Sequence, residues 1–250
     1  ATSPFIGRDA EFRAMIGAVR RLLQGEGAVL TISGDKGTGK SFLLRQTEAY
    51  FGHRMGLLAE SAGRQTHGES RTWVRGRSRS YNQGWPYSLW VDLFNDWFSF
   101  RADDPRDEKL ARLRYRLGEL AEDGFEHQLP HLARLMGLPT TTEWQERLRH
   151  LDAETLRSEL AQAVRRLVTL ASRRAPMVIT LADLQWADES SIALLRECLP
   201  LCRTEPVLFC LTYRSGAEPL LQTLDLDEGL ADRVTNVLME PLDAAERREH

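Results

Sequence analysis

The chain has 250 residues, of which 42% are hydrophobic and 28% are charged, and its formal net charge is −3. These values are ordinary for a folded protein of one large or two small domains, and they argue against a broadly basic nucleic-acid binder. No apolar run approaches the ~18 residues of a membrane span, the N-terminus has no signal pattern, and the three cysteines lack metal-ligand spacing. We therefore expect a cytoplasmic protein without membrane contact.

The first predicted elements are a helix, a strand and a second helix. Between Asp9 and Leu23 apolar residues recur at helical spacing, and a glycine-rich turn ends the pattern. Residues 28–32 are apolar and rich in β-branched side chains, which is typical of a buried strand. The second helix is predicted from Lys40 to about residue 50, and residues 55–62 can extend it beyond a candidate interruption at Gly52.

The loop between the strand and the second helix, residues 33–41 (SGDKGTGKS), fits the phosphate-binding pattern G-x-x-x-x-G-K-[ST]. The backbone N–H groups of such a loop and of the following helix form a concave anion site. Lys40 supplies a charge for the β- and γ-phosphates of a nucleotide, and Ser41 offers a hydroxyl oxygen to Mg²⁺. The alternative, an ordinary glycine turn, is disfavoured because both flanking elements fit the motif. The nucleotide-binding residues predicted here are Gly34, Asp35, Lys36, Gly37, Thr38, Gly39, Lys40, Ser41 and Phe42.

Arginines mark the next predicted strand, residues 71–78. With a period of two, Arg71, Arg75, Arg77 and Arg79 share one face. Such a row can bind nucleic acid or phosphate, or it can protect an edge strand from pairing with another chain. We favour the edge strand, because no stacking platform accompanies the arginines.

Helices dominate the middle of the chain. The helix predicted over residues 88–100 is rich in aromatic side chains, which we expect in the core. Its aromatic stripe consists of Trp90, Phe94, Trp97 and Phe98. Residues 101–150 are predicted to form a helical insertion. A long helix follows, with Asp152 as its N-cap and Pro176 after its end.

Three further strands are predicted after the long helix. Residues 177–181 form a buried strand that is followed by Asp183, and residues 206–212 form another that is followed by Arg214. The last strand covers residues 234–238.

Two further predictions concern helix ends. Asp188 precedes a helix that starts near residue 190, so we expect it to cap that helix; a role in the site is the alternative. Another helix is predicted to begin at Pro241. We expect residues 1–250 to form one ATPase core domain that stops at a domain boundary, with the C-terminal lid largely absent.

Five apolar strands separated by helices predict an α/β fold, a three-layer P-loop NTPase sandwich with a mainly parallel sheet. Ligands of such sheets bind beyond the carboxyl ends of the strands, where the phosphate loop, Asp183 and Arg214 should meet. Ser41 and Asp183 are the predicted Mg²⁺ ligands, and Lys40, Asp183 and Arg214 the predicted catalytic residues. The chain has no N-K-x-D motif, which favours ATP or ADP over guanine nucleotides.

Several segments jointly resemble a known family. In chain order they are FIGRDAE (residues 5–11), the phosphate loop, LQWAD (184–188), LTYR (211–214) and EPL (240–242). They are similar to the AAA-type ATPase domain of STAND regulators, which occurs in large LuxR-family activators and beside nucleotidyl cyclase or kinase domains. The resemblance implies an ATP-dependent switch that self-associates in the ATP state and responds to an effector through other regions. It also implies that Arg8 contacts the nucleotide and that Arg214 senses it.

One position departs from this family. Two consecutive acids usually precede its Leu-His-Trp-Ala-Asp segment, whereas this chain has Ala182 before Asp183, and Gln185 replaces the histidine. Nucleotide binding should survive this change, but hydrolysis should be slow or absent. Two alternatives remain open: a nucleic-acid-handling ATPase resembling AAA-type replication initiators, and a scaffold that uses nucleotide only structurally. We do not expect this domain to bind nucleic acid directly.

Overall fold

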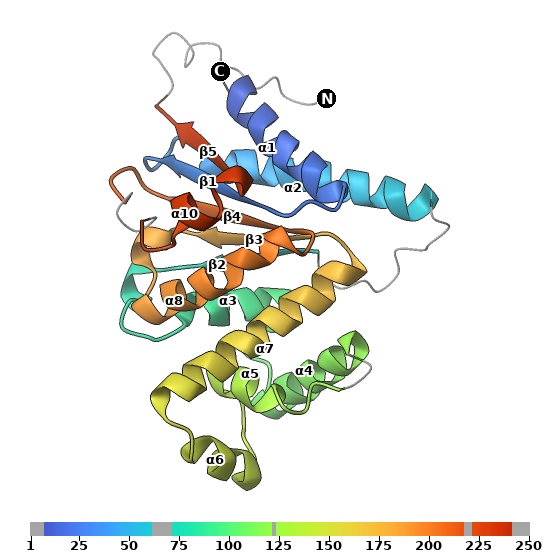
Figure 1. Cartoon of the computed structure of the whole chain (residues 1–250), viewed down its shortest axis with the longest axis vertical. Helices are drawn as coiled ribbons and strands as arrows, with labels where there is room; N and C mark the ends of the chain where they lie inside the picture. The colour runs from blue at the N-terminus through green and yellow to red at the C-terminus, as the bar shows by residue number, and fades with distance from the viewer. Residues whose placement is uncertain (1–7, 62–71, 122–123, 218–221, 242–250) are drawn as a thin grey trace.

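The computed structural model describes residues 8–61, 72–121, 124–217 and 222–241. They form three layers, in which one central sheet lies between two layers of helices (Figure 1). The strands are β1 Ala28–Gly34, β2 Trp73–Arg77, β3 Met177–Ala182, β4 Val207–Tyr213 and β5 Val234–Met239. They lie in the order β2-β3-β4-β1-β5, and every neighbouring pair is parallel. The predicted α/β fold class with a parallel sheet is confirmed.

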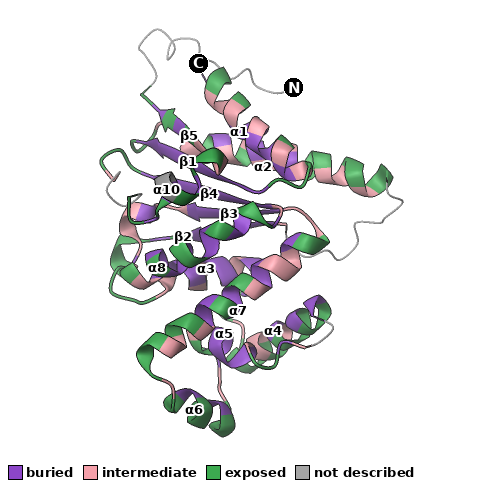
Figure 2. Ribbon diagram, viewed as in Figure 1, coloured by how far each residue is buried: buried purple, intermediate pink, exposed green. Residues whose placement is uncertain are grey.

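Alternating side chains of the strands enter two separate cores. Leu30 of β1 and Leu208 of β4 face the layer formed by α1 Asp9–Leu23 and α2 Lys40–Ser61. Phe209 faces the opposite layer, which consists of α3 Ser88–Trp97, α7 Ala153–Arg174 and α8 Glu189–Cys198. Because helices cover both faces, β1 and β4 are buried along their whole length (Figure 2).

Strand β2 forms one edge of the sheet, as predicted, and α3 packs directly against it. Gly76 permits this approach, because a Cβ atom there would lie 2.7 Å from the carbonyl oxygen of Leu89. The carboxylate of Asp96 accepts a hydrogen bond of 3.0 Å from the backbone N–H of Arg75, and Asp92 accepts one of 2.9 Å from that of Arg77. Two outward-facing N–H groups of this edge are therefore already paired.

The arginine side chains around β2 also have acidic partners. Arg75 forms an ion pair with Glu48 of α2, and Arg79 lies 3.6 Å from a carboxylate oxygen of Asp92. Arg71 lies outside the described residues. This pairing supports the edge-strand interpretation over a free basic row.

Residues 101–150 contain α4 Arg106–Leu120, α5 Leu129–Leu135 and α6 Thr142–Arg149. Helices α4 and α5 pack against α7, and their leucines continue the core of that layer. Asp152 caps α7 as predicted, since its side chain accepts a 2.7 Å hydrogen bond from the backbone N–H of Thr155. That these helices form an insertion stays a prediction.

Some element boundaries differ from the predicted ones. Helix α2 continues through Gly52 to Ser61, because an internal glycine costs a helix only about 1 kcal/mol. Helix α3 ends at Trp97, and Ser99 then adopts a φ of 55°. Phe100 therefore lies beyond the helix, although its side chain is still buried in the core. The short helical segments are η1 Ser80–Asn82, η2 Leu184–Trp186, η3 Leu199–Arg203, α10 Leu226–Gly229 and η4 Ala231–Arg233. Residues 1–7 and the helix predicted after Pro241 lie outside the described residues.

Candidate nucleotide-binding site

The phosphate loop connects the end of β1 to the start of α2. Gly34, Gly37 and Gly39 have φ angles of 146°, 88° and 94°, which side chains of L-residues rarely adopt. At Gly34 a Cβ atom would in addition lie 2.4 Å from the carbonyl oxygen of Met239 on β5. The glycines of the motif are thus required by the backbone, and the helix that begins at Lys40 has the geometry of a phosphate site.

Lys40 is held by carbonyl oxygens of its own loop. Its ammonium group donates hydrogen bonds to the carbonyl oxygens of Gly34 and Asp35, the latter at 2.7 Å. Partial burial lowers the pKa of Lys40 below the ordinary lysine value, although the nearby Asp183 carboxylate opposes this shift. A phosphate in the loop would offer this cation an anionic acceptor, which is stronger than a carbonyl oxygen.

Asp183 follows β3 in a left-handed conformation with a φ of 58°. Its backbone N–H donates to the hydroxyl of Thr212 on β4 at 3.2 Å, which fixes the turn. Its carboxylate accepts hydrogen bonds from Arg77 Nε at 2.7 Å and from Gln185 Nε2 at 3.4 Å. The strand end thus presents one carboxylate that already has a cationic partner.

Arg214 follows β4 and is positioned by two residues of the segment after β3. Its backbone N–H donates to Gln185 Oε1 at 3.2 Å, and its guanidinium carbon lies 5.8 Å from the ring centre of Trp186. Gln185 therefore connects the segments after β3 and β4. The aromatic ring stabilises the guanidinium position by a cation–π contact.

Most of the predicted site residues line one hollow of about 660 Å³ beyond the carboxyl ends of the strands, whereas Gly34, Asp35 and Thr38 of the loop do not. Lys40, Ser41, Asp183 and Arg214 all line it, together with Lys36, Gly37, Gly39 and Phe42 of the loop segment. The convergence predicted from three strand ends is thus observed.

The sequence did not assign a second group of lining residues to this site, although Arg77 and Arg79 belonged to the arginine row for which phosphate binding was the disfavoured alternative. This group consists of Arg77, Ser78, Arg79, Ser80, Tyr81 and Trp186. All but Trp186 come from the end of β2 and the segment after it. The missing information was the strand order, since β2 lies beside β3 and its carboxyl end meets that of β3. Trp186 lay within the LQWAD segment but was given no role.

Arg8 touches the phosphate loop but is not among the residues that line this hollow. Its side chain is nearly buried and donates to Glu11 Oε1 at 2.8 Å and to the carbonyl oxygen of Glu240. One of its nitrogen atoms also lies 3.5 Å from the carbonyl oxygen of Thr38. The contact of Arg8 with nucleotide stays a prediction.

The donor set of the hollow suits a Mg²⁺ ion that arrives with a nucleotide. Mg²⁺ bound to nucleotides uses one or two carboxylates plus phosphate oxygens and water. Ser41 offers a hydroxyl oxygen and Asp183 a carboxylate, whereas Ala182 offers neither. No cluster of three or more ligating His, Cys, Asp or Glu side chains occurs in the described part of the chain, so an all-protein metal site is not apparent there.

Asp188 has a structural role. It is buried at the N-terminus of α8, where its carboxylate accepts hydrogen bonds from the backbone N–H groups of Tyr87, Ser88 and Ser191 at 2.8–3.1 Å. It also accepts bonds from the hydroxyls of both serines. These bonds confirm its predicted role as a helix cap, and Asp188 is not among the residues that line the hollow.

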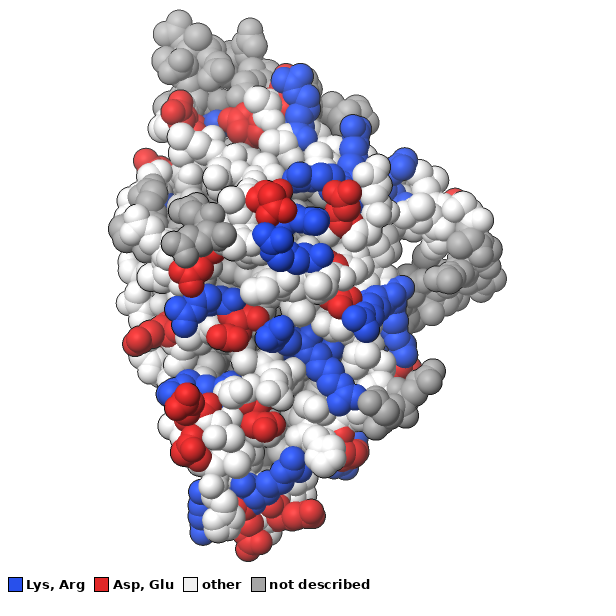
Figure 3. Space-filling model, viewed as in Figure 1, with Lys and Arg blue, Asp and Glu red and all other residues white. Residues whose placement is uncertain are grey.

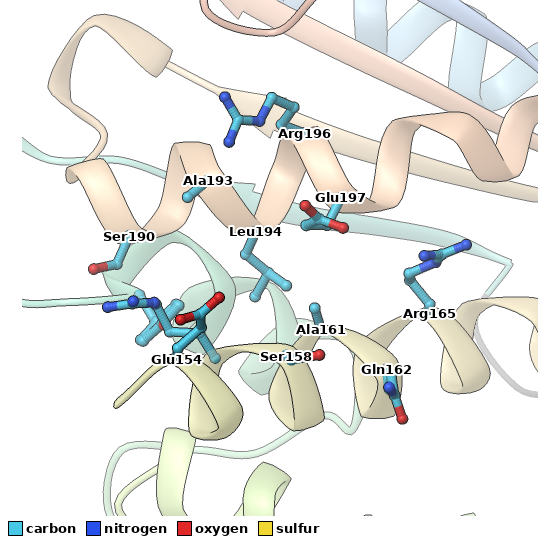
Figure 4. Close-up of a pocket in the computed structure, with 12 residues that line it drawn as sticks. Glu154, Ser158, Ala161, Gln162, Arg165, Ser190, Ala193, Leu194, Arg196 and Glu197 are labelled. Atoms are coloured by element: carbon cyan, nitrogen blue, oxygen red, sulfur yellow. The ribbon is translucent and has the colours of Figure 1, made fainter. Parts of the chain in front are cut away.

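Charged side chains of both signs and a further hollow occur elsewhere on the described surface. Acidic and basic side chains are interspersed over the face shown in Figure 3. A second hollow, of about 460 Å³, lies between α7 and α8, where Arg165, Arg196, Glu154 and Glu197 line it (Figure 4). It shares no lining residue with the hollow at the strand ends. None of the described helices has both the length and the apolar composition of a membrane span.

Solved structures with a similar course of the chain include three archaeal proteins. The Walker-type ATPase PABY2304 of Pyrococcus abyssi is 14% identical with a TM-score of 0.41, covering 98% of this chain and 56% of its own. Orc1 of Aeropyrum pernix, solved in complex with DNA, is 13% identical with a TM-score of 0.49, and the match covers 98% of this chain and 48% of the Orc1 chain. Orc2 of the same organism, solved as ADPNP–ADP complexes, is 14% identical with a TM-score of 0.41, and the match covers 96% of this chain and 49% of the Orc2 chain. The chain thus spans about half the length of these proteins.

Comparison with families gives a direct match. No curated protein matches the chain. The model of the family described as "AAA ATPase domain" matches residues 4–210, a range that includes the phosphate loop, Asp183 and most of the sheet. Since this match covers well over half of the sequence, the chain belongs to the AAA ATPase domain family.

Proposed function

We propose that this domain binds ATP and ADP together with Mg²⁺ and acts as a slowly hydrolysing molecular switch within a signal-transduction or transcription regulator. One observation carries the proposal most: Lys40, Ser41, Asp183 and Arg214 come from three strand ends and line a single hollow. The regulatory context rests on the resemblance to STAND regulators.

Each residue has a defined task in this proposal. The loop N–H groups and Lys40 bind the β- and γ-phosphates, and Ser41 and Asp183 orient the metal-bound face of the nucleotide. Mg²⁺, when bound, supplies positive charge between the phosphates. Arg214 reaches the γ-phosphate, and its contacts with Gln185 and Trp186 would transmit the nucleotide state to the segment after β3.

Slow turnover is proposed because one acid is absent. Hydrolysis needs charge neutralisation by the metal and a group that orients or activates water. In this chain Asp183 alone would have to serve both needs, since Ala182 carries only a methyl group.

Calorimetric titration with ADP and a non-hydrolysable ATP analogue in the presence of Mg²⁺ tests the binding. We expect saturable binding by the wild type, a clear preference over guanine nucleotides, and a loss of at least about tenfold in affinity for Lys40→Ala. Lys109→Ala is the matched control, because Lys109 lies on α4 and does not line the hollow. Absence of adenine-nucleotide binding, with Lys40→Ala behaving like the wild type, would overturn the proposal.

The switch itself predicts a change of assembly. Light scattering coupled to size exclusion should show a larger species with the ATP analogue than with ADP. An identical mass in both states would refute self-association as the output of this domain.

A further inference from the structure

The guanidinium group of Arg77 pairs with Asp183, the predicted carboxylate ligand of Mg²⁺ at the candidate site. Arg77 is the last residue of β2 and is the register partner of Ala182 on β3. Its Nε atom donates a 2.7 Å hydrogen bond to Asp183 Oδ2, and the two side chains form an ion pair. The side chain of Arg77 is 64% exposed and that of Asp183 is 25% exposed, so both remain open to the hollow.

The charges around the hollow make the ion pair of Arg77 and Asp183 important for metal binding. Among the described residues that line it, Asp183 is the single acid. The cationic lining residues are Lys36, Lys40, Arg77, Arg79 and Arg214. A site with two adjacent acids could bind a metal with one and an arginine with the other. Here Ala182 removes that option, so Mg²⁺ and Arg77 require the same carboxylate.

We propose that Arg77 substitutes for the metal at Asp183, so that this domain binds nucleotide almost independently of Mg²⁺. The inference rests on the proposed function, because it concerns the same nucleotide and the same hollow. While Arg77 neutralises Asp183, the phosphates meet no uncompensated negative charge and are attracted by the surrounding cations. When Mg²⁺ accompanies the nucleotide, it has to displace Arg77 before Asp183 can interact with it. Arg77 is thus a positioning residue that sets the metal dependence of binding.

The decisive quantity is the ratio of the ADP dissociation constant in EDTA to that in Mg²⁺. We expect this ratio to be close to one in the wild type. In Arg77→Gln the free Asp183 carboxylate repels metal-free nucleotide and attracts Mg²⁺, so the ratio should rise about tenfold. Calorimetry or a fluorescent ADP analogue measures both constants without any turnover.

Two variants separate this effect from a general loss of charge. Arg79→Gln removes a cation from the same hollow, but Arg79 pairs with Asp92 rather than with Asp183. It should weaken binding with and without Mg²⁺ by a similar factor and leave the ratio near the wild-type value. Arg77→Lys keeps the charge and should keep the ratio low.

Removal of Asp183 completes the test. In an Asp183→Asn background the change of Arg77 to Gln should no longer alter the ratio, because the carboxylate for which both cations compete is absent. Equal ratios in wild type, Arg77→Gln and Arg79→Gln, with nucleotide still bound, would overturn the inference alone. A wild type that binds no nucleotide in either buffer would overturn the proposed function, and the inference with it.

Discussion

The carboxylate of Asp188 holds the backbone of Tyr87 in place across 101 positions of sequence, through a hydrogen bond of 2.8 Å from the Tyr87 N–H. Tyr87 has a φ of 61°, and α3 begins directly after it. The same carboxylate caps α8 through Ser191. One buried side chain therefore fixes the starts of two helices, of which α3 covers the edge strand that ends in Arg77.

Replacement of Asp188 by Ala should destabilise the fold without removing any residue of the nucleotide site. The change leaves several buried donors without an acceptor, so we expect the free energy of unfolding to fall by about 3 kcal/mol. Urea unfolding followed by circular dichroism measures it. Asp152→Ala removes the cap of α7, but Asp152 is exposed. This change should lower the free energy of unfolding by a clearly smaller amount. Equal losses in both variants would contradict the role assigned to Asp188.

Nucleotide affinity should fall as the pH rises through the pKa of Lys40, which lies below the ordinary lysine value of 10.5. Burial lowers the pKa of Lys40, so its proton is lost at a lower pH than that of an exposed lysine. Bound phosphate favours the charged form, and the affinity is therefore highest below this pKa. In Lys40→Arg the guanidinium stays charged, and its residual affinity should not show this decline. Parallel pH profiles would exclude Lys40 as the group responsible.

Ala182→Asp should increase ATP hydrolysis, because it adds the carboxylate that this strand end lacks. Then one acid can interact with the metal while the other orients water. We expect the single-turnover rate to rise by about tenfold or more. The asparagine of Ala182→Asn is almost the same size as aspartate but carries no charge, so hydrolysis by this variant should remain slow. A wild type without detectable single turnover, combined with tight binding, would instead favour the alternative of a nucleotide-bound scaffold.

The three thiols should be unreactive in the folded protein. Cys198, Cys202 and Cys210 are buried and free, and burial raises the pKa of Cys202 to about 11 and that of Cys210 to about 12. Burial also raises the pKa of Cys198. Because the thiolate is the reactive form, a thiol reagent at neutral pH should modify all three only after unfolding. Rapid modification of the native protein would show that the core around the modified thiol opens locally.

Local sequence patterns predicted the strands, the phosphate loop and the two aspartate caps, because each depends on residues close together in the chain. The end of α3 was wrong, because the position of Ser99 is set by packing rather than by periodicity. The end of α2 stayed open between two alternatives, because the sequence pattern does not show that the helix tolerates Gly52. The ion pair between Arg77 and Asp183 was also missed. It depends on which strands are neighbours, and that order is a property of the whole sheet.

The capped edge of β2 limits how copies of this domain can associate. Edge strands commonly recruit a further strand from another molecule by continuing the backbone ladder. Here the carboxylates of Asp92 and Asp96 occupy the N–H groups of Arg77 and Arg75, so an incoming strand would have to compete with two charged acceptors and displace α3. We therefore expect copies of this domain to associate at the β2 edge through side-chain contacts, and not by extending the sheet with a further strand.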